Sequence, residues 1–403
     1  MILIILSLSL LAFTFCFSQE INSIPENALN KICSNYGIIG AAIGFENPGN
    51  KMTFSYGYAD KNKKIPMKPD TYITAASICK TFNAVGLMIL WQKGLVSLDE
   101  DVSRYLGYQL RNPYYPFHKI TLRHLMTHTA GLIDTTNYVE FLKKTSSDVN
   151  LPFKELLLKE GKFYKADLWK NSPPGKCFSY ANISSGIIAC IIEKISGLRF
   201  DIYMKKNVFT PLEIHRGYSD WEIYKGTNLS CTYAYLTNKN KWITYNGLVN
   251  RPRIINRRDQ NYHLGMNGLA YNPQGSLNII PTDLFSLIDL LIETDLEKKK
   301  ILHPWAIEEM LKIQWEGTGD PDHLYYKKKG LNLLITDEIV PGHRLYGHTG
   351  RKNGMVGAFF ADPVQKKGGY VLINGMINDS RGSSAYFRVV EEIFQLLWNR
   401  DEK

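Results

Sequence analysis

The sequence predicts a mixed α/β fold of the α+β kind, in which strands from both ends of the chain form one antiparallel sheet flanked by helices. Runs of residues with strand propensity occur near both ends, and helical patterns fill the region between them. We therefore expect an α/β part at about residues 19–75 and 330–403, with a mostly helical region inserted between its two halves.

Four strands are predicted. Ile38–Phe45 and Met52–Tyr58 flank Asn47–Asn50, an Asn-Pro-Gly-Asn sequence that favours a turn, so they are expected to form an antiparallel hairpin. Near the C-terminus, Met355–Ala361 and Gly369–Asn374 are expected to pair in the same way.

Helices are predicted from apolar periodicity at Ser77–Trp91, Leu122–Thr127, Ile183–Ser196, Thr282–Glu293 and Ser384–Trp398. Gly197 is expected to end the third of them. The polar stretch Lys225–Tyr262 has the poorest periodicity, and we interpret it as an excursion within one domain.

The composition is that of a globular protein. Of the 403 residues, 44% are hydrophobic and 21% are charged, which excludes collagen, wholesale disorder and a polytopic membrane protein. The net charge of +10 is spread over short runs such as Lys61–Lys64, Arg257–Arg258 and Lys327–Lys329. Scattered runs are typical of a solvated surface, so we expect no nucleic-acid partner.

The N-terminus has the pattern of a signal peptide. Residues 1–18 carry no charge, and Ile2–Phe17 form a mostly apolar run that ends near the small residues Cys16 and Ser18. We expect a signal peptide at 1–18 and a mature domain at 19–403, secreted or in the lumen of the secretory pathway. Because the leader has no Lys or Arg, an uncleaved N-terminal membrane anchor is the alternative.

Entry into that pathway would permit disulfides and glycans. Five cysteines remain after cleavage, an odd number that leaves at least one thiol free or intermolecular. Glycosylation sequons occur at Asn182, Asn228 and Asn378, which predicts a glycoprotein.

The helix predicted at Ser77–Trp91 is the most informative segment. Its second half is apolar or glycine, which is typical of a buried helix, whereas its first two turns carry polar residues. Burying an ammonium without partners is costly, so Lys80 is expected to face a polar cavity in which its pKa falls.

Ser77 and Lys80 are three residues apart, which places them on one helix face with Cβ atoms about 5–6 Å apart. Ser77 would lie at the helix N-terminus, where backbone N–H groups and the macrodipole favour a developing negative charge. A hydroxyl, a nearby amine and a positive helix end together meet the requirements of a nucleophilic serine. The alternative interpretation of Ser77 is a simple N-cap.

Two other segments carry companion groups. Tyr180 and Asn182, two residues apart before the helix at Ile183, are able to point the same way. A phenol beside an ammonium has its ionised form favoured, so Tyr180 is a candidate base for Ser77, and Asn182 is a candidate for holding a substrate amide. The alternative for Tyr180 is a tyrosine of the core, and the alternatives for Asn182 are an N-cap or a glycan acceptor. A glycan on Asn182 would obstruct the proposed site.

The third segment, Tyr346–Arg351, precedes the strand predicted at Met355 and taken alone has the composition of a turn. Its glycines, among them Gly350, would let a substrate backbone approach, and His348 and Thr349 are candidate donors to a carbonyl or carboxylate. The backbone N–H of Arg351 is a candidate second oxyanion donor beside that of Ser77.

At these segments the chain resembles the serine β-lactamase-like superfamily, in particular its branch of class C β-lactamases, DD-peptidases and esterases, which has a penicillin-binding-protein-like transpeptidase fold. The resemblance rests on three motifs in the family's order and at family-like separations: Ser77-Ile78-Cys79-Lys80, Tyr180-Ala181-Asn182 and His348-Thr349-Gly350. Ile120–Leu132 is similar to the family's "LLTHTSGL" stretch, and the likeness covers nearly the whole mature chain.

The resemblance implies roles for these residues. Ser77 would be the nucleophile, Lys80 and Tyr180 would share proton transfer, and Asn182 would orient the substrate. His348-Thr349-Gly350 would lie along a β-strand wall of the site. One departure matters: class C β-lactamases have Lys where His348 stands, and the His form is similar to that of the peptidases and esterases.

We therefore expect a secreted serine hydrolase that forms an acyl-enzyme on Ser77 and acts on an ester or amide. The alternatives are a β-lactam-hydrolysing enzyme and a catalytically idle secreted scaffold that binds or self-assembles. The expected partner is a small-molecule or peptide substrate. The sequence does not specify the oligomeric state.

No metal or cofactor is expected. His124 and His128 are four apart on a helical pattern, but Leu125 stands where a His-Glu-x-x-His site has its glutamate, and no third ligand is evident. These histidines are predicted to make structural hydrogen bonds. The sequence contains no Gly-x-Ser-x-Gly elbow, phosphate loop or dinucleotide fingerprint.

Overall fold

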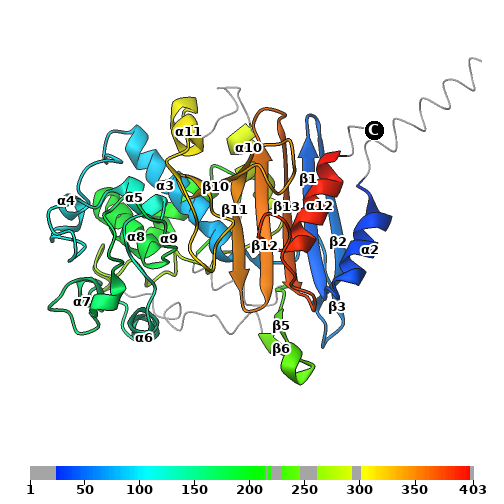
Figure 1. Cartoon of the computed structure of the whole chain (residues 1–403), viewed down its shortest axis with the longest axis horizontal. Helices are drawn as coiled ribbons and strands as arrows, with labels where there is room; N and C mark the ends of the chain where they lie inside the picture. Colours follow the sequence, from blue (N-terminus) through cyan, green and yellow to red (C-terminus); the bar gives the residue numbers. More distant parts are fainter. Residues whose placement is uncertain (1–23, 215–216, 219–227, 246–260, 293–300, 400–403) are drawn as a thin grey trace, which may run out of the picture.

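The computed structural model describes residues 24–214, 217–218, 228–245, 261–292 and 301–399, so the predicted signal peptide lies outside the described residues. Its centre is a nine-stranded antiparallel sheet with the order β3-β2-β1-β13-β12-β11-β10-β9-β8 (Figure 1). These strands are β1 (Gly40–Asn47), β2 (Asn50–Asp60), β3 (Ile65–Pro66), β8 (Trp315–Glu316), β9 (Lys328–Gly330), β10 (Leu333–Thr336), β11 (Leu345–Lys352), β12 (Met355–Asp362) and β13 (Lys367–Gly375). The predicted sheet built from both ends of the chain is confirmed.

The N-terminal and C-terminal strands meet where β1 pairs with β13, with Ile43 opposite Val371. The predicted hairpin is present, and Asn47 pairs with Asn50 at its turn. The central strands are buried on both faces because helices cover both sides, which explains their nearly continuous apolar sequences.

Alternate residues of the central strands enter two different cores. Phe360 packs with α2 (Glu26–Asn35) and α12 (Arg388–Trp398) on one face, whereas Phe359 packs with α10 (Asp283–Ile292) and the helical region on the other. Figure 1 shows α12 lying across the sheet beside α2. The last helix begins at Arg388 rather than at the predicted Ser384, because Ser384 lies in a turn whose N–H donates to the Glu391 carboxylate.

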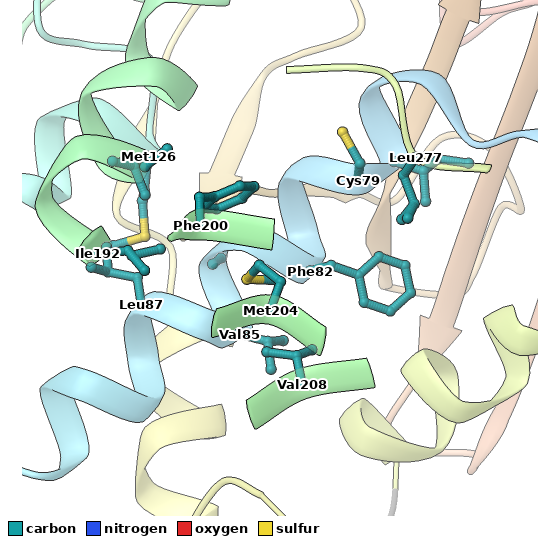
Figure 2. Packing of buried hydrophobic residues seen from close by; sticks show 14 of the residues in the cluster. Cys79, Phe82, Val85, Leu87, Met126, Ile192, Phe200, Met204, Val208 and Leu277 are labelled. Carbon is teal, nitrogen blue, oxygen red and sulfur yellow. The ribbon is translucent and has the colours of Figure 1, made fainter. Parts of the chain in front are cut away.

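The inserted region is mostly helical, as predicted. It contains η1 (Ala76–Ile78), α3 (Cys79–Gln92), α4 (Ser103–Leu106), α5 (Leu122–Met126), α6 (Thr136–Thr145), α7 (Lys154–Leu157), η2 (Ala166–Leu168), α8 (Ile183–Ser196), α9 (Phe200–Met204), the π-helical η3 (Lys205–Phe209) and α11 (Pro304–Leu311). α8 has its predicted bounds and ends at Gly197, whose φ is +68°. Figure 2 shows Phe82 and Val85 of α3 in the core beside Met204 and Val208.

Short strand pairs complete the fold. β4 (Ile73–Thr74) pairs with β7 (Asn278–Ile279), and the polar excursion contains a hairpin of β5 (Thr232–Leu236) and β6 (Lys241–Tyr245) with η5 (Thr237–Lys239) between them. The short strands β8 and β9 show that residues before 330 also contribute to the large sheet.

None of the helices in the described part of the chain is long and apolar enough to cross a membrane. No disulfide is formed by the cysteines in that part, which are Cys33, Cys79, Cys177, Cys190 and Cys231.

Candidate active site

Ser77 lies where the helical region begins, in the η1 turn that leads directly into α3. Its side chain is half-buried at the bottom of a cleft. The residue before it, Ala76, has a φ of +45°, in the left-handed region that non-glycine residues rarely adopt. The chain thus enters the helix through a strained turn that presents Ser77 to the cleft.

Lys80 lies three residues later, and its side chain is fully buried. Its Nζ donates hydrogen bonds to Ser77 Oγ at 3.0 Å, to Asn182 Oδ1 at 2.8 Å and to the Gln274 carbonyl at 2.6 Å. Burial lowers the pKa of Lys80 to about 8, although the neighbouring Cys79 and Asp134 act in the opposite direction. The predicted polar cavity and lowered pKa are both present, so near pH 8 about half of these amines are neutral.

Tyr180 precedes α8, and its ring is half-buried in the wall of the cleft. The Lys80 Nζ lies 5.1 Å from the ring centroid. Burial raises the pKa of Tyr180 well above 10, and its hydrogen bond with Ser77 offsets this only in part. The prediction that the ammonium would favour the ionised phenol is therefore wrong: desolvation dominates and keeps the phenol neutral.

Asn182 uses both ends of its amide. Its Oδ1 accepts from Lys80, while its Nδ2 donates to Asp134 Oδ2 at 2.7 Å. The same Asp134 carboxylate accepts the backbone N–H groups of Asn182 and Ile183, which begin α8. A glycan on Nδ2 would disrupt this arrangement, so the geometry favours the site residue over the glycan acceptor.

Asp134 is a residue that the sequence reasoning missed. It caps the N-terminus of α8 and fixes the orientation of the Asn182 amide. Nothing in its spacing from the motifs pointed to this function, because the contact joins residues 48 positions apart.

The opposite wall of the cleft is strand β11. Its segment 345–347 pairs with β10, whereas 348–352 pair only with β12, which leaves the other edge free to approach η1. A Cβ atom at Gly350 would lie 2.8 Å from the Ala75 carbonyl oxygen, so glycine is what permits this approach. The segment that taken alone resembled a turn is thus a strand, as the resemblance implied, and it lies beside the serine.

The candidate residues on this strand have different positions. Arg351 is exposed and lines the cleft beside Ser77, and Thr349 lines it next to Tyr326, whose hydroxyl is 3.1 Å from Thr349 Oγ1. The His348 ring is fully buried and does not line the cleft, and its Nδ1 lies 2.6 Å from the Thr349 carbonyl oxygen.

This position of His348 corrects the expectation that its side chain donates to a substrate. Burial, followed by the charges of Lys329 and Lys80, lowers the pKa of His348 well below 6.5, so the ring is neutral. It supports the strand from behind instead of facing the cleft.

The cleft has two halves, which share Ser77, Asn182 and Arg351 in their linings. One half has a volume of about 480 Å³ and contains Lys352, whose Nζ donates to the Gly275 carbonyl and to Ser276 Oγ. The other half has a volume of about 550 Å³ and contains Tyr180. A substrate carbonyl at Ser77 would therefore have room on both sides of the bond to be broken.

His128 makes the kind of structural hydrogen bond that the sequence predicted. Its Nδ1 accepts the N–H of Ala181 at 3.3 Å, and its ring stacks on Tyr180 with centroids 4.3 Å apart. His128 therefore holds the segment that carries Tyr180. The residues described by the structure include no group of three or more His, Cys, Asp or Glu side chains arranged for a metal.

Comparison with known proteins agrees with this geometry. The chain is 30% identical over 203 residues to a Beta-lactamase from Escherichia coli (strain K12), a match that covers 50% of this chain and 49% of that protein. The chain spans about half the length of the curated relatives it matches.

Two solved structures share the fold. The octameric penicillin-binding protein homologue from Pyrococcus abyssi aligns with a TM-score of 0.72 at 23% identity, over 93% of this chain and 78% of that one. The D-amino acid amidase from Ochrobactrum anthropi SV3 aligns with a TM-score of 0.67 at 18% identity, over 94% and 97%.

The family described as Beta-lactamase matches residues 21–392, nearly the whole chain. That match includes the three motifs that converge at Ser77. The chain therefore belongs to the Beta-lactamase family, a family of serine hydrolases.

Proposed function

We propose that the chain is an enzyme that hydrolyses an ester or amide through an acyl-enzyme on Ser77. The observation that carries the proposal is the position of Lys80, fully buried with a pKa of about 8 and with its Nζ 3.0 Å from Ser77 Oγ. A neutral amine at hydrogen-bond distance from a serine hydroxyl is the arrangement that activates such a nucleophile.

In the acylation step, Lys80 Nζ takes the proton of Ser77 Oγ as the oxygen attacks the substrate carbonyl. The negative charge that forms on the carbonyl oxygen is stabilised by the backbone N–H groups of Ser77 and Arg351, which belong to η1 and to the free edge of β11. Tyr180, kept neutral by burial, donates a proton to the leaving group and regains one from Lys80.

The substrate class is an ester or amide with substituents on both sides of the carbonyl, because the cleft continues past Ser77 in two directions. The likeness to a D-amino acid amidase is a likeness of fold, and it makes amides of amino acids a reasonable first test. β-Lactam hydrolysis is the second candidate, supported by the family itself. The buried neutral His348, where class C β-lactamases have Lys, weighs against it.

The test is covalent labelling followed by a substrate screen. A fluorophosphonate probe is expected to attach to Ser77, with Ser77→Ala as the control, and a panel of p-nitrophenyl esters, D-amino-acid amides and nitrocefin identifies the preferred acyl donor. Tyr180→Phe is expected to lower the acylation rate by about 10²-fold or more, the contribution of a general acid. Rapid nitrocefin turnover that Ser77→Ala abolishes would favour the β-lactamase alternative. Absence of labelling by every acyl donor would favour the idle scaffold.

Secretion is a separate proposal. Its support is the uncharged apolar run Ile2–Phe17. Sequencing the N-terminus of protein recovered from the medium of secreting cells is expected to give a start near Gln19. Recovery only with the membrane fraction would instead favour the uncleaved anchor.

A further inference from the structure

Asp320 and His323 form a pair in the loop between β8 and β9, on the Tyr180 side of the cleft. Asp320 Oδ1 is 2.7 Å from His323 Nδ1, and Asp320 Oδ2 accepts the backbone N–H of Tyr180 at 2.9 Å. No motif in the sequence singles out either residue, and the acylation step described above uses neither of them.

The pair packs against Tyr180, the proposed proton donor of the acylation step. The His323 ring stacks on the Tyr180 ring, with centroids 4.6 Å apart and an angle of 22° between the planes. The His128 ring also stacks on the Tyr180 ring, with centroids 4.3 Å apart. Two imidazoles from separate loops therefore pack against one phenol. His128 is fully buried, whereas 27% of the His323 side chain is exposed to the cleft.

The hydrogen bond to Asp320 fixes which nitrogen of His323 is free to react. Burial raises the pKa of Asp320, but hydrogen bonds from His323 and from the Tyr180 N–H outweigh it and hold that pKa below its usual value. The group is therefore a carboxylate, which can only accept, so Nδ1 of His323 carries the proton. In the neutral ring the lone pair is then on Nε2. His323 is also the one histidine among the described residues that line the cleft.

For water to release an acyl-enzyme, a group near the acyl carbon has to accept a proton from that water. Once Ser77 is acylated, its Oγ no longer carries a proton, and Lys80 is enclosed beneath it by three hydrogen-bond acceptors. The half of the cleft that contains Tyr180 and His323 has a volume of about 550 Å³, which leaves room for both an acyl group and a water molecule. An imidazole held by a carboxylate at this place has the chemistry of a general base.

Resting on the proposed hydrolase function, we propose that His323, oriented by Asp320, is the catalytic base of deacylation. The oxygen of a water molecule bonds to the acyl carbon as His323 Nε2 takes one of its protons. The tetrahedral intermediate then collapses and the bond between the acyl carbon and Ser77 Oγ breaks. Ser77 Oγ takes a proton from the Tyr180 hydroxyl. The Tyr180 oxygen then regains a proton from solvent, and His323 releases to solvent the proton that it took from the water molecule. The products are the free acid and the resting enzyme.

The test separates acylation from deacylation in His323→Phe, which retains an aromatic ring to stack on Tyr180 but has no Nε2. With a p-nitrophenyl ester that the wild type turns over, stopped-flow measurement is expected to give a p-nitrophenol burst of unchanged rate. Steady-state turnover is expected to fall by about 10²-fold or more. Intact mass spectrometry is expected to find the acyl-enzyme accumulated in this variant, and hydroxylamine, a nucleophile that needs no base, is expected to restore turnover. His118→Phe, which changes an exposed histidine outside the cleft lining, serves as the control.

Two results would overturn the inference alone: steady-state turnover within about twofold of the wild type in His323→Phe, or a burst rate that falls in proportion to turnover, which would mean that the ring only positions Tyr180. Asp320→Asn provides an independent variant, expected to slow deacylation more than acylation. If the wild type showed neither a burst nor fluorophosphonate labelling, the proposed function itself would fail, and the inference would fail with it.

Discussion

At the scale of single residues, burial decides which group carries the proton in this site. Lys80 and Tyr180 lie next to one another, and desolvation favours the neutral form of both side chains. It therefore lowers the pKa of the lysine and raises the pKa of the tyrosine. For the lysine this yields an amine that accepts a proton near neutral pH. For the tyrosine it yields a phenol that donates one. The sequence predicted the lowered pKa of Lys80 correctly, but it predicted the wrong direction for the pKa of Tyr180. The motif spacing placed the ammonium beside the phenol, but it did not show how far packing would desolvate the phenol.

A second buried lysine, Lys329, takes no part in the proposed proton transfers. Lys329 is fully buried on β9, and its Nζ has no hydrogen-bond partner among the described residues. The Nζ lies over the Tyr326 ring, 4.6 Å from the ring centroid. Burial, and then the charge of Lys80, lowers the pKa of Lys329 from 10.5 to about 7. This lysine therefore lowers the stability of the fold at every pH at which it is protonated in the unfolded chain.

We predict that Lys329→Met stabilises the fold at pH 6.5 by up to about 5 kcal/mol, because the pKa falls from 10.5 to about 7 and each pKa unit corresponds to about 1.4 kcal/mol. Because the folded pKa lies below the unfolded one, the cost is fully present below about pH 7 and disappears as the pH rises toward 10.5. Urea unfolding of both proteins at pH 6.5 and pH 9.5 measures this. A difference in stability that stays constant between the two pH values would show that the lysine charge is not its source.

At the scale of secondary-structure elements, the site depends on the close approach of β11 to η1. The serine comes from η1 and the second oxyanion donor from β11, so the spacing of these two elements sets the geometry of the oxyanion site. Gly350 permits that spacing, since the position of its missing Cβ is 2.8 Å from the Ala75 carbonyl oxygen.

Gly350→Ala is accordingly expected to lower the rate of Ser77 acylation by at least about tenfold and to destabilise the fold by about 1–3 kcal/mol through overpacking. Labelling kinetics and urea unfolding measure the two effects. Gly49→Ala is the control without overpacking: nothing lies within 4 Å of its Cβ position, and its cost comes from its φ of +88°, a backbone strain that Gly350 does not have. If Gly350→Ala lost stability and kept its acylation rate, the spacing would not control the chemistry.

The elements that the sequence predicted well are those with strong local signals. α8 is apolar throughout and ends at a glycine, and the hairpin of β1 and β2 has a Pro-Gly turn. β11 lacked such a signal, because its polar, glycine-containing sequence has no strand alternation and its pairing partners come from elsewhere in the chain. The contacts of Asp134, Asp320 and His323 were unpredictable for the same reason: each joins loops distant in sequence.

At the scale of the whole molecule, the site lies at the junction between the sheet and the inserted helical region. Ser77 and Lys80 begin the inserted region, Tyr180 and Asn182 lie at the start of α8, and Arg351 comes from the C-terminal part of the sheet. One core cluster contains residues of α3, α8 and the central strands together, so the packing that stabilises the fold also holds these segments in register. The three motifs are distant in sequence and become one site only through this core.

The three glycosylation sequons differ in how accessible their asparagine side chains are. Asn378 is exposed, whereas the Asn182 amide is bonded at both ends and Asn228 Nδ2 donates to Thr71 Oγ1. In protein passed through a secretory pathway, we expect a glycan at Asn378 and none at Asn182. Peptide mapping with and without a glycosidase measures this, and Asn378→Gln is expected to remove the added mass. A glycan found on Asn182 would contradict the site described above.

The central claim is that the Lys80 amine activates Ser77, and the rate at which a fluorophosphonate labels Ser77 as a function of pH tests it most directly. The labelling rate of the wild type is expected to rise with pH through an inflection near pH 8, because the fraction of neutral Lys80 increases there. Lys80→Arg retains a positive charge that does not titrate in this range, and its labelling is expected to be slower by about 10²-fold or more at every pH. A Lys80→Arg variant that labelled at the rate of the wild type, or a wild-type rate that did not change between pH 6 and pH 10, would contradict the claim.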